Sequence, residues 1–164
     1  MNKKGQSAME YLMTYGWAIL VIIIVIAVLF YIGVLNPRNL TPASCTFPPG
    51  ISCGSYKLSS TGYLTMYIGQ ATGRRVNITG INCTQNQAVP ATYTAVVIPI
   101  SNGEQAQVCF GTSGNCTCVA QTGTTALSGN VGDSAKFKIY MTYIETDTLI
   151  TRSAIGDMSA RYES

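Results

Sequence analysis

Residues 17–35 read WAILVIIIVIAVLFYIGVL, a run of 19 residues without a charged or strongly polar side chain. At a rise of about 1.5 Å per residue, a helix of this length crosses the hydrocarbon layer of a bilayer. Residues 21–26 are all β-branched, which by itself favours a strand. Lipid reverses that preference, because a lone strand leaves its backbone groups unpaired there. The run therefore predicts a helix that is apolar on every side.

The residues flanking the run predict how it is oriented. Lys3 and Lys4 lie on its short N-terminal side, so this end is expected to face the cytoplasm and the rest of the chain the outside. Aromatic side chains stand at both ends of the run, as they do at membrane interfaces. Pro37 disfavours helical geometry at Asn36, where the helix is expected to end. The simplest interpretation is a single-pass membrane anchor.

Glu10 is the residue that an anchor does not explain. On insertion scales, a charged side chain at the centre of an apolar span costs about 2.5–3.5 kcal/mol. A carboxylate at the edge of the span is also costly unless a cation pairs with it. Cleavage after Gly5 would create such a cation, the α-amino group of Gln6, four residues before Glu10. Within one helix or between staggered neighbours, this ammonium could neutralise the carboxylate.

The N-terminal motif carries a family resemblance. KKG at residues 3–5, followed by QSAMEYL at residues 6–12 and a long apolar helix, resembles the class III signal peptide of archaeal type IV pilin-like proteins. In that family a prepilin peptidase cuts between the glycine and the glutamine and leaves the helix on the mature protein. The resemblance implies that Gly5 ends the leader, Gln6 begins the mature chain and Glu10 is its fifth residue.

One position departs from the family pattern. Many members have serine at mature position three, where this chain has Ala8, with Ser7 one place earlier. The resemblance covers about 35 residues and implies a filament in which the helices form the core. The expected partners are other copies of the chain, the prepilin peptidase, the assembly machinery and, before assembly, the membrane. The helix also contains small residues, at which neighbouring helices could pack closely or which a span simply tolerates: Gly16, Ala18, Ala27 and Gly33.

The cysteines all follow the apolar run. An even set on the far side of a membrane span predicts a disulfide framework in an oxidising compartment, and its members are Cys45, Cys53, Cys83, Cys109, Cys116 and Cys118. The Cys116-x-Cys118 spacing is too tight for a zinc knuckle. Fifteen connectivities are open. Pro48, Pro49 and Gly50 would turn the chain back between Cys45 and Cys53, which favours that pair.

The remaining chain shows period-two patterning. Its predicted strands are Tyr63–Ile68, Val76–Ile81, Ala95–Ile100, Gln105–Phe110, Lys136–Ile144 and Leu149–Ala154. Their spacing of about ten residues predicts an antiparallel β-sandwich. Residues 111–135, rich in glycine and threonine, are expected to form long surface loops. The predicted organisation is thus an α+β chain with a leader (1–5), a hydrophobic helix (6–36) and an extracellular β-domain (37–164).

Sequons provide candidate glycosylation sites. They begin at Asn39, Asn77, Asn82 and Asn115. The middle residue of the sequons at Asn82 and Asn115 is a cysteine, and early disulfide formation there would hinder modification. Asn39 and Asn77 are therefore the better candidates.

Composition argues against enzymes and nucleic-acid binding. The chain has no histidine, the commonest general base and metal ligand, and its net charge is only +3. No basic patch for nucleic acid is evident. No catalytic, cofactor-binding or metal site is predicted, although a serine–lysine arrangement with Lys57, Lys136 or Lys138 stays open.

Several function classes remain after this reasoning. The first is a pilin-like filament subunit for surface attachment or cell contact. The alternatives are a membrane-anchored extracellular binding domain, an archaellin or minor pilin, and an extracellular enzyme.

Overall fold

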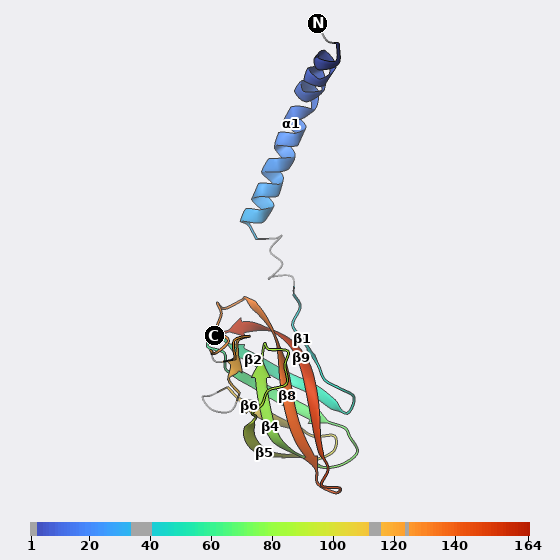
Figure 1. The fold of residues 1–164 in the computed structure, drawn as a ribbon, viewed down its shortest axis with the longest axis vertical. Helices are drawn as coiled ribbons and strands as arrows, with labels where there is room; N and C mark the ends of the chain where they lie inside the picture. The colour runs from blue at the N-terminus through green and yellow to red at the C-terminus, as the bar shows by residue number, and fades with distance from the viewer. Residues whose placement is uncertain (1–2, 34–40, 112–115, 124) are drawn as a thin grey trace. The chain divides into compact units, whose positions relative to one another are not determined.

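The computed structural model describes residues 3–33, 41–111, 116–123 and 125–164, without the side chains of residues 3–8 and Leu12. The chain divides into two compact units, Met1–Leu40 and Thr41–Ser164, and each is described by itself. The described part of the first unit is a helix, and that of the second is built of strands (Figure 1). An apolar N-terminal helix followed by a strand-rich domain was the sequence prediction, and it is confirmed at this level.

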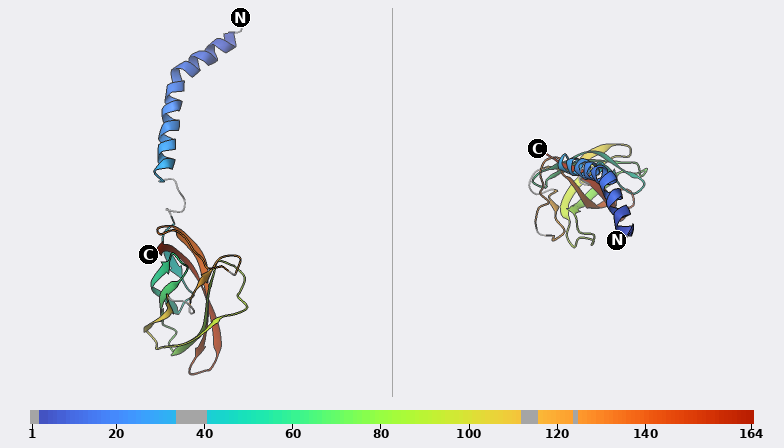
Figure 2. Two further views of the ribbon diagram at one scale, coloured as in Figure 1. Left: turned by 90° about the vertical axis from the view of Figure 1, so that its left-hand side faces the viewer. Right: turned by 90° about the horizontal axis from the view of Figure 1, so that it is seen from above.

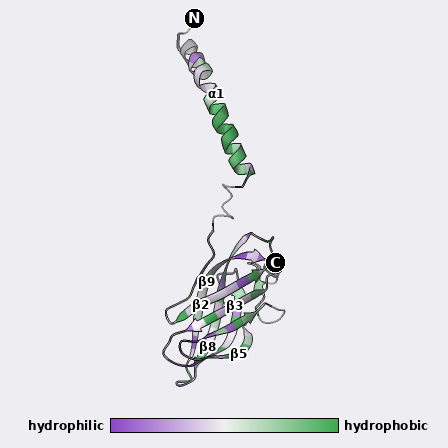
Figure 3. Cartoon of the chain, turned by 180° about the vertical axis from the view of Figure 1, so that it is seen from behind, coloured by the Kyte–Doolittle hydropathy of each residue, from purple (hydrophilic) through white to green (hydrophobic). Residues whose placement is uncertain are grey.

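The helix α1 spans Lys3–Tyr31. Its hydrophobic residues concentrate in the half towards Tyr31, whereas the first turns are mixed (Figure 3). It bends in its N-terminal half (Figure 2). There the Thr14 hydroxyl donates a hydrogen bond to the Glu10 carbonyl oxygen at 2.8 Å. This kind of back-bonding often bends a helix.

The end of α1 is set by a glycine. The Ile32 N–H still donates to the Val28 carbonyl at 2.9 Å, and the Gly33 N–H donates to Phe30 at 3.1 Å. Gly33 has φ of 72°, the left-handed conformation typical of a helix C-cap. The helix thus begins and ends earlier than the predicted range 6–36. Asn36 and Pro37 lie outside the described residues.

The strands of the second unit follow one another in chain order. They are β1 (Ser44–Thr46), β2 (Ile51–Ser59), β3 (Leu64–Gln70), β4 (Val76–Thr84), β5 (Thr94–Ile100), β6 (Gln105–Phe110), β7 (Cys118–Val119), β8 (Ser134–Glu145) and β9 (Thr151–Glu163).

The strands form one hydrogen-bonded path in the order β5-β4-β8-β9-β2-β3-β6. Off this path, β1 pairs with β9 and β7 with β4. The pairs β2–β9 and β4–β7 are parallel, and the others are antiparallel. The two end strands, β5 and β6, contact each other. The sheet is therefore mixed and barrel-like.

This topology corrects the predicted antiparallel sandwich. A sandwich has two separate sheets, but here β9 pairs with β8 along its length and with β2 at Tyr162 and Glu163, so one path joins both halves. Strand spacing along the chain is similar in sandwiches and barrels. It therefore did not distinguish them.

Alternation along β8 builds one wall of the core. Phe137, Ile139 and Met141 are buried, whereas Lys136 and Lys138 lie on the opposite face with more exposure. The same logic applies to β9, where the buried positions include Ala154, Gly156 and Met158. Because several of those residues are small, the hydrophobic pattern of β9 is weak. The prediction consequently covered only its beginning.

Two other regions also differ from the predictions. β2 was missed because its alternation breaks at a register shift between Cys53 and Tyr56. Residues 111–135 were expected to be surface loops, yet their described part contains β7 and the buried Leu127. The Leu127 N–H donates to the Cys118 carbonyl at 2.7 Å, which ties this segment to the core.

The cysteines form three disulfides, and none is free. Cys45–Cys53 is the pair that the intervening prolines favoured, so that prediction is confirmed. The other pairs are Cys83–Cys118 and Cys109–Cys116. The thiol groups are therefore engaged with one another in this structure.

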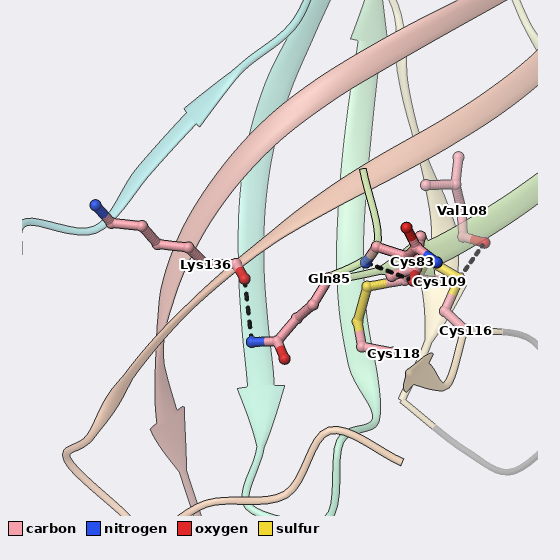
Figure 4. The surroundings of a disulfide bond; sticks show 9 residues. Cys83, Gln85, Val108, Cys109, Cys116, Cys118 and Lys136 are labelled. Atoms are coloured by element: carbon pink, nitrogen blue, oxygen red, sulfur yellow. Dashed lines mark hydrogen bonds between the residues drawn. A yellow bond between two sulfur atoms is a disulfide. The ribbon is translucent and has the colours of Figure 1, made fainter. Parts of the chain in front are cut away.

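The Cys83–Cys118 and Cys109–Cys116 disulfides lie close together in the core (Figure 4). Residues 116–118 are linked through Cys118 to β4 and through Cys116 to β6. β6 is one end of the sheet path, and β4 lies next to the other end. The two bonds therefore tie β6, at one end of the path, and β4, next to the other end, to one short segment.

Hydrogen bonds from Gln70 connect β3 with β5, two strands that are far apart along the sheet path. Its side chain is buried at the end of β3, where its amide nitrogen donates to the Ile100 carbonyl at 3.2 Å and to the Arg74 carbonyl at 2.7 Å. Its amide oxygen accepts from the Thr72 N–H at 3.1 Å and from the Thr72 hydroxyl at 2.8 Å. The Gln70 side chain is thus a fully satisfied polar link between β3 and β5.

Replacing Gln70 by leucine is expected to lower the free energy of unfolding by about 2–3 kcal/mol, because the buried Ile100 carbonyl and two part-buried backbone groups lose their partner. Urea unfolding of the full chain in detergent micelles, followed by tyrosine fluorescence, measures this change. Gln121→Leu, at an exposed turn position, is the matched control and should stay within about 0.5 kcal/mol of wild type. Equal stability of the two variants would contradict the assigned role.

A second polar cluster lies where β8 turns into β9. The Arg152 Nε donates to the Glu145 Oε1 at 2.6 Å, and the Thr148 hydroxyl donates to Oε2 at 3.0 Å. The Thr148 hydrogen bond first, and then the Arg152 guanidinium, hold the pKa of Glu145 below its ordinary value of 4.5, against the opposing effect of desolvation. The folded chain therefore binds this proton less tightly than the unfolded chain does.

The lowered pKa predicts a pH dependence of stability. A depressed carboxyl pKa contributes stability above the unfolded value, near pH 4.5, and this contribution is lost as the pH falls through the folded value. Urea midpoints measured between pH 7 and pH 3 should fall more steeply for wild type than for Glu145→Gln. Glu104→Gln, at an exposed position outside this cluster, should keep the wild-type slope. Identical slopes for wild type and Glu145→Gln would refute the prediction.

Candidate functional site in the N-terminal helix

Among the described residues of the first unit, no other segment covers the apolar surface of α1. Large hydrophobic side chains are exposed on every side of the helix, for example Trp17, Ile22, Ile23 and Ile24. Among the described residues, Met13–Tyr31 forms a helix long and apolar enough to cross a membrane, a test that a signal sequence also passes. Since such a surface is unfavourable in water, lipid or other protein must cover it.

The aromatic residues of α1 lie at both ends of this surface. The rings of Tyr11 and Tyr15 pack one helical turn apart, with centroids 4.5 Å from each other. Trp17 follows them, and Phe30 and Tyr31 are exposed at the opposite end. Amphipathic rings in these places suit the two interfaces of a bilayer.

The predicted cleavage bond between Gly5 and Gln6 lies within the first turns of α1, which begins at Lys3. The side chains of both residues are outside the description. The backbone at this bond is helical, and cleavage there stays a prediction.

Glu10 is exposed on α1, one helical turn after Gln6. Among the side chains that the structure describes, its carboxylate has no ion-pair partner. A carboxylate beside an apolar span is costly in lipid unless it is paired. A positive charge placed near Glu10 would therefore lower the cost of keeping this end of the helix in an apolar environment.

The small residues of α1 differ in their surroundings. A Cβ atom added at Gly16 would contact nothing within 4 Å, so this surface is open to another helix. Gly33 instead has the structural role of the C-cap described above. The open space at Gly16 is compatible with both interpretations left open by the sequence, close packing and simple tolerance, whereas Gly33 is explained by its role as the C-cap.

The sequons divide between described and undescribed residues. Asn77 is half-buried in β4. Asn82 donates from its side-chain nitrogen to the Thr92 carbonyl at 2.9 Å, so the atom that would carry a sugar is already engaged. Asn39 and Asn115 lie outside the described residues. Glycosylation stays a prediction, with Asn77 the better placed of the two described sites.

Two of the lysines considered for a serine–lysine pair contact groups other than a serine hydroxyl. Lys57 donates to the Ser164 carbonyl at 2.5 Å, and Lys138 lies 3.6 Å from Asp157. Among the described residues there is also no cluster of three acidic, cysteine or histidine side chains suited to a metal. These groups therefore give no support to the alternative that the chain is an extracellular enzyme.

Sequence reasoning missed one polar site on the strand domain. The alternation that predicts β8 also places Lys136 and Lys138 on one outward face, opposite Ser159 and Asp157 of β9. That pairing was not available from the sequence, because β9 was predicted only as far as Ala154. A cavity lies over these residues.

Comparisons with protein-family models, with curated proteins and with solved structures found no match to this chain.

Proposed function

We propose that the chain is a prepilin, cleaved between Gly5 and Gln6, whose mature form is a subunit of an extracellular type IV pilus-like filament. The observation that carries the proposal is the position of Glu10. It lies four residues after the proposed new N-terminus, at the start of a helix whose apolar surface is exposed on all sides. Surface attachment or cell contact is the proposed purpose.

The helix supports this function through its uniform surface. A helix that is apolar all round is compatible with lipid before assembly and with identical helices afterwards. It can therefore pass from membrane to filament core without refolding. In the core, the Gln6 ammonium of one subunit would pair with the Glu10 carboxylate of its own helix or a neighbour, which removes the cost of both charges.

The strand domain supports an external location. Three disulfides form and persist in an oxidising environment, and they fit the side of the membrane opposite the two N-terminal lysines. In the proposed filament, the helices make the core and these domains make the outer sheath.

Shearing of intact cells tests this function. Sheared material is pelleted, viewed by negative-stain electron microscopy and quantified by mass spectrometry. The proposal predicts filaments in which this chain is an abundant component. A low abundance within filaments built of another protein would instead indicate a minor pilin. Rotation of the filaments on live, tethered cells, recorded by light microscopy before shearing, would indicate an archaellin.

A second candidate function is a permanently anchored extracellular binding domain. The observation in its favour is that Met13–Tyr31 alone has the length and composition of a membrane span. This candidate predicts that shearing releases no polymer and that detergent extracts the chain as a monomer. Finding the chain only in the membrane fraction would therefore replace the first proposal with the second.

A further inference from the structure

A cavity of about 360 Å³ lies on the outer face of the sheet, over β8, β9 and β1. Its volume is within the range of about 300–1,000 Å³ that is typical of ligand sites. Its lining includes Ser44, Lys136, Lys138, Asp157 and Ser159. The cavity belongs to the strand domain and shares no residue with α1.

Strand register explains why these side chains meet. Ser44 of β1 is paired with Ser159 of β9, which is paired in turn with Lys136 of β8. Two residues along, Thr46 is paired with Asp157 and Asp157 with Lys138. Because residues two apart share a face of a strand, the two rows point outward together. They form a floor three strands wide that carries lysines, hydroxyls and one carboxylate.

The segment after β4 forms one wall of the cavity. The Gln85 side-chain amide donates to the Lys136 carbonyl oxygen at 3.2 Å (Figure 4). The Tyr140 hydroxyl donates to the Gln87 carbonyl oxygen at 3.0 Å. Both glutamines line the cavity. These bonds hold the wall against β8, so the cavity is supported by the fold on two sides.

The charges in the cavity are unequally paired. Lys138 lies 3.6 Å from Asp157, which offsets part of its charge. Within the described residues, the Lys136 ammonium has neither an ion pair nor a hydrogen bond. The floor therefore presents a net positive charge, centred on Lys136, to whatever enters.

Ser159 adds to the lining a polar group that the fold itself does not satisfy. Its side chain is only 6% exposed, and its hydroxyl oxygen has no hydrogen-bond partner among the described residues. A buried hydroxyl without a partner costs about 1–3 kcal/mol. Ser159 is among the residues that line the cavity, and its hydroxyl oxygen is covered in this conformation. Rotation of the side chain about χ1 would turn the hydroxyl towards a ligand held there.

We propose that this cavity binds an acidic oligosaccharide, with the anionic group of one sugar on Lys136 and sugar hydroxyls on Ser159, Ser44 and Gln85. Lysine is a suitable point charge for a carboxylate or a sulfate. Serine hydroxyls and glutamine amides both donate and accept, as sugar hydroxyls require. The inference does not depend on filament formation, since every group involved is in the strand domain.

The lining argues against other classes of ligand. Its two large apolar residues, Phe137 and Met158, are 4% and 3% exposed, so they offer little surface to a lipid chain. For the same reason the cavity has no exposed aromatic ring on which a nucleic-acid base could stack. A polar, weakly cationic cavity is best matched by a polar, anionic ligand.

Titration calorimetry on the full chain in detergent micelles tests the proposal. The probes are trigalacturonate, its neutral methyl ester and a sulfated trisaccharide. We expect binding of the charged probes and at least a tenfold weaker response to the ester. Tighter binding of either charged probe identifies the anionic group that the cavity prefers.

Variants locate the binding. Lys136→Gln should weaken the affinity for trigalacturonate at least tenfold, and Ser159→Ala should weaken it several-fold. Lys57→Gln, at an exposed lysine outside the cavity, should leave it unchanged. Equal weakening by Lys57→Gln would mean non-specific attraction, and it would overturn the proposal, as would the absence of binding to both charged probes.

A measurement on the wild-type chain covers the case in which a variant fails to fold. Reductive methylation of Lys136 should slow in the presence of trigalacturonate, whereas that of Lys57 should not. Unchanged methylation of Lys136 at saturating ligand would reject the site. If Lys136 is instead protected only in assembled filaments, the cavity is a contact between copies. Because the probes are tested on unassembled chain, a negative result leaves the filament proposal intact.

Discussion

Glu10→Ala is expected to reduce the amount of this chain in sheared filaments at least a hundredfold, while the precursor still accumulates in the membrane. The carboxylate is exposed at the start of the apolar helix and has no ion-pair partner among the described side chains. In the proposed core it neutralises the Gln6 ammonium. Removing one partner of a buried pair costs about 3–5 kcal/mol, because the other charge is left alone. That is a factor of about a hundred to several thousand at each contact.

The controls separate assembly from export. Alanine at this position makes membrane insertion easier, so the membrane pool should persist. Glu10→Asp keeps the charge and should retain part of the filaments. Glu104→Ala, at an exposed position of the strand domain, should assemble like wild type. Normal filaments from Glu10→Ala would favour the anchored binding domain over the pilin.

Replacing both Cys83 and Cys118 by alanine is expected to lower the free energy of unfolding by about 4 kcal/mol. The two cysteines are separated by 35 positions, the longest interval among the three disulfides. Chain-entropy arguments give the larger stabilisation to the longer loop. Both sulfurs are also in the core, at the segment that joins β6, at one end of the sheet path, to β4, next to the other end.

The shorter disulfide provides the comparison. Cys45 and Cys53 are 8 positions apart, and their double alanine variant should lose about 2.5 kcal/mol by the same argument. Thermal unfolding in detergent should then show a decrease of roughly 10–20 °C for the Cys83/Cys118 variant and a smaller one for the other. A larger effect of the Cys45/Cys53 replacement would mean that the core segment does not control stability.

The sequence predicted the helix because its cause is local. An uncharged run as long as a bilayer span needs no information from distant residues. The helix end was predicted less well, because Gly33 adopts a left-handed conformation that only its surroundings reveal, and Pro37 was the more visible signal. The Cys45–Cys53 pair was also a local inference, resting on the prolines between the two cysteines.

The sheet was harder because its order depends on distant contacts. Most predicted strand segments lie in observed strands, but β2 contains a bulge and β9 turns small residues inward, so neither has a strong period-two pattern. Without the full β9, the path that joins both halves into a barrel-like sheet cannot be predicted. The cavity was missed for the same reason, since Lys136 and Ser159 meet only through the β8–β9 register.

The central claim is that Gly5–Gln6 is a processing site and that the helix behind it assembles filaments. N-terminal sequencing of material sheared from the cell surface, together with its intact mass, tests cleavage, export and assembly at once. The predicted result is a chain that begins with Gln6-Ser7-Ala8 and is recovered as a polymer. A sheared chain that still carries Met1 through Gly5 would contradict the account.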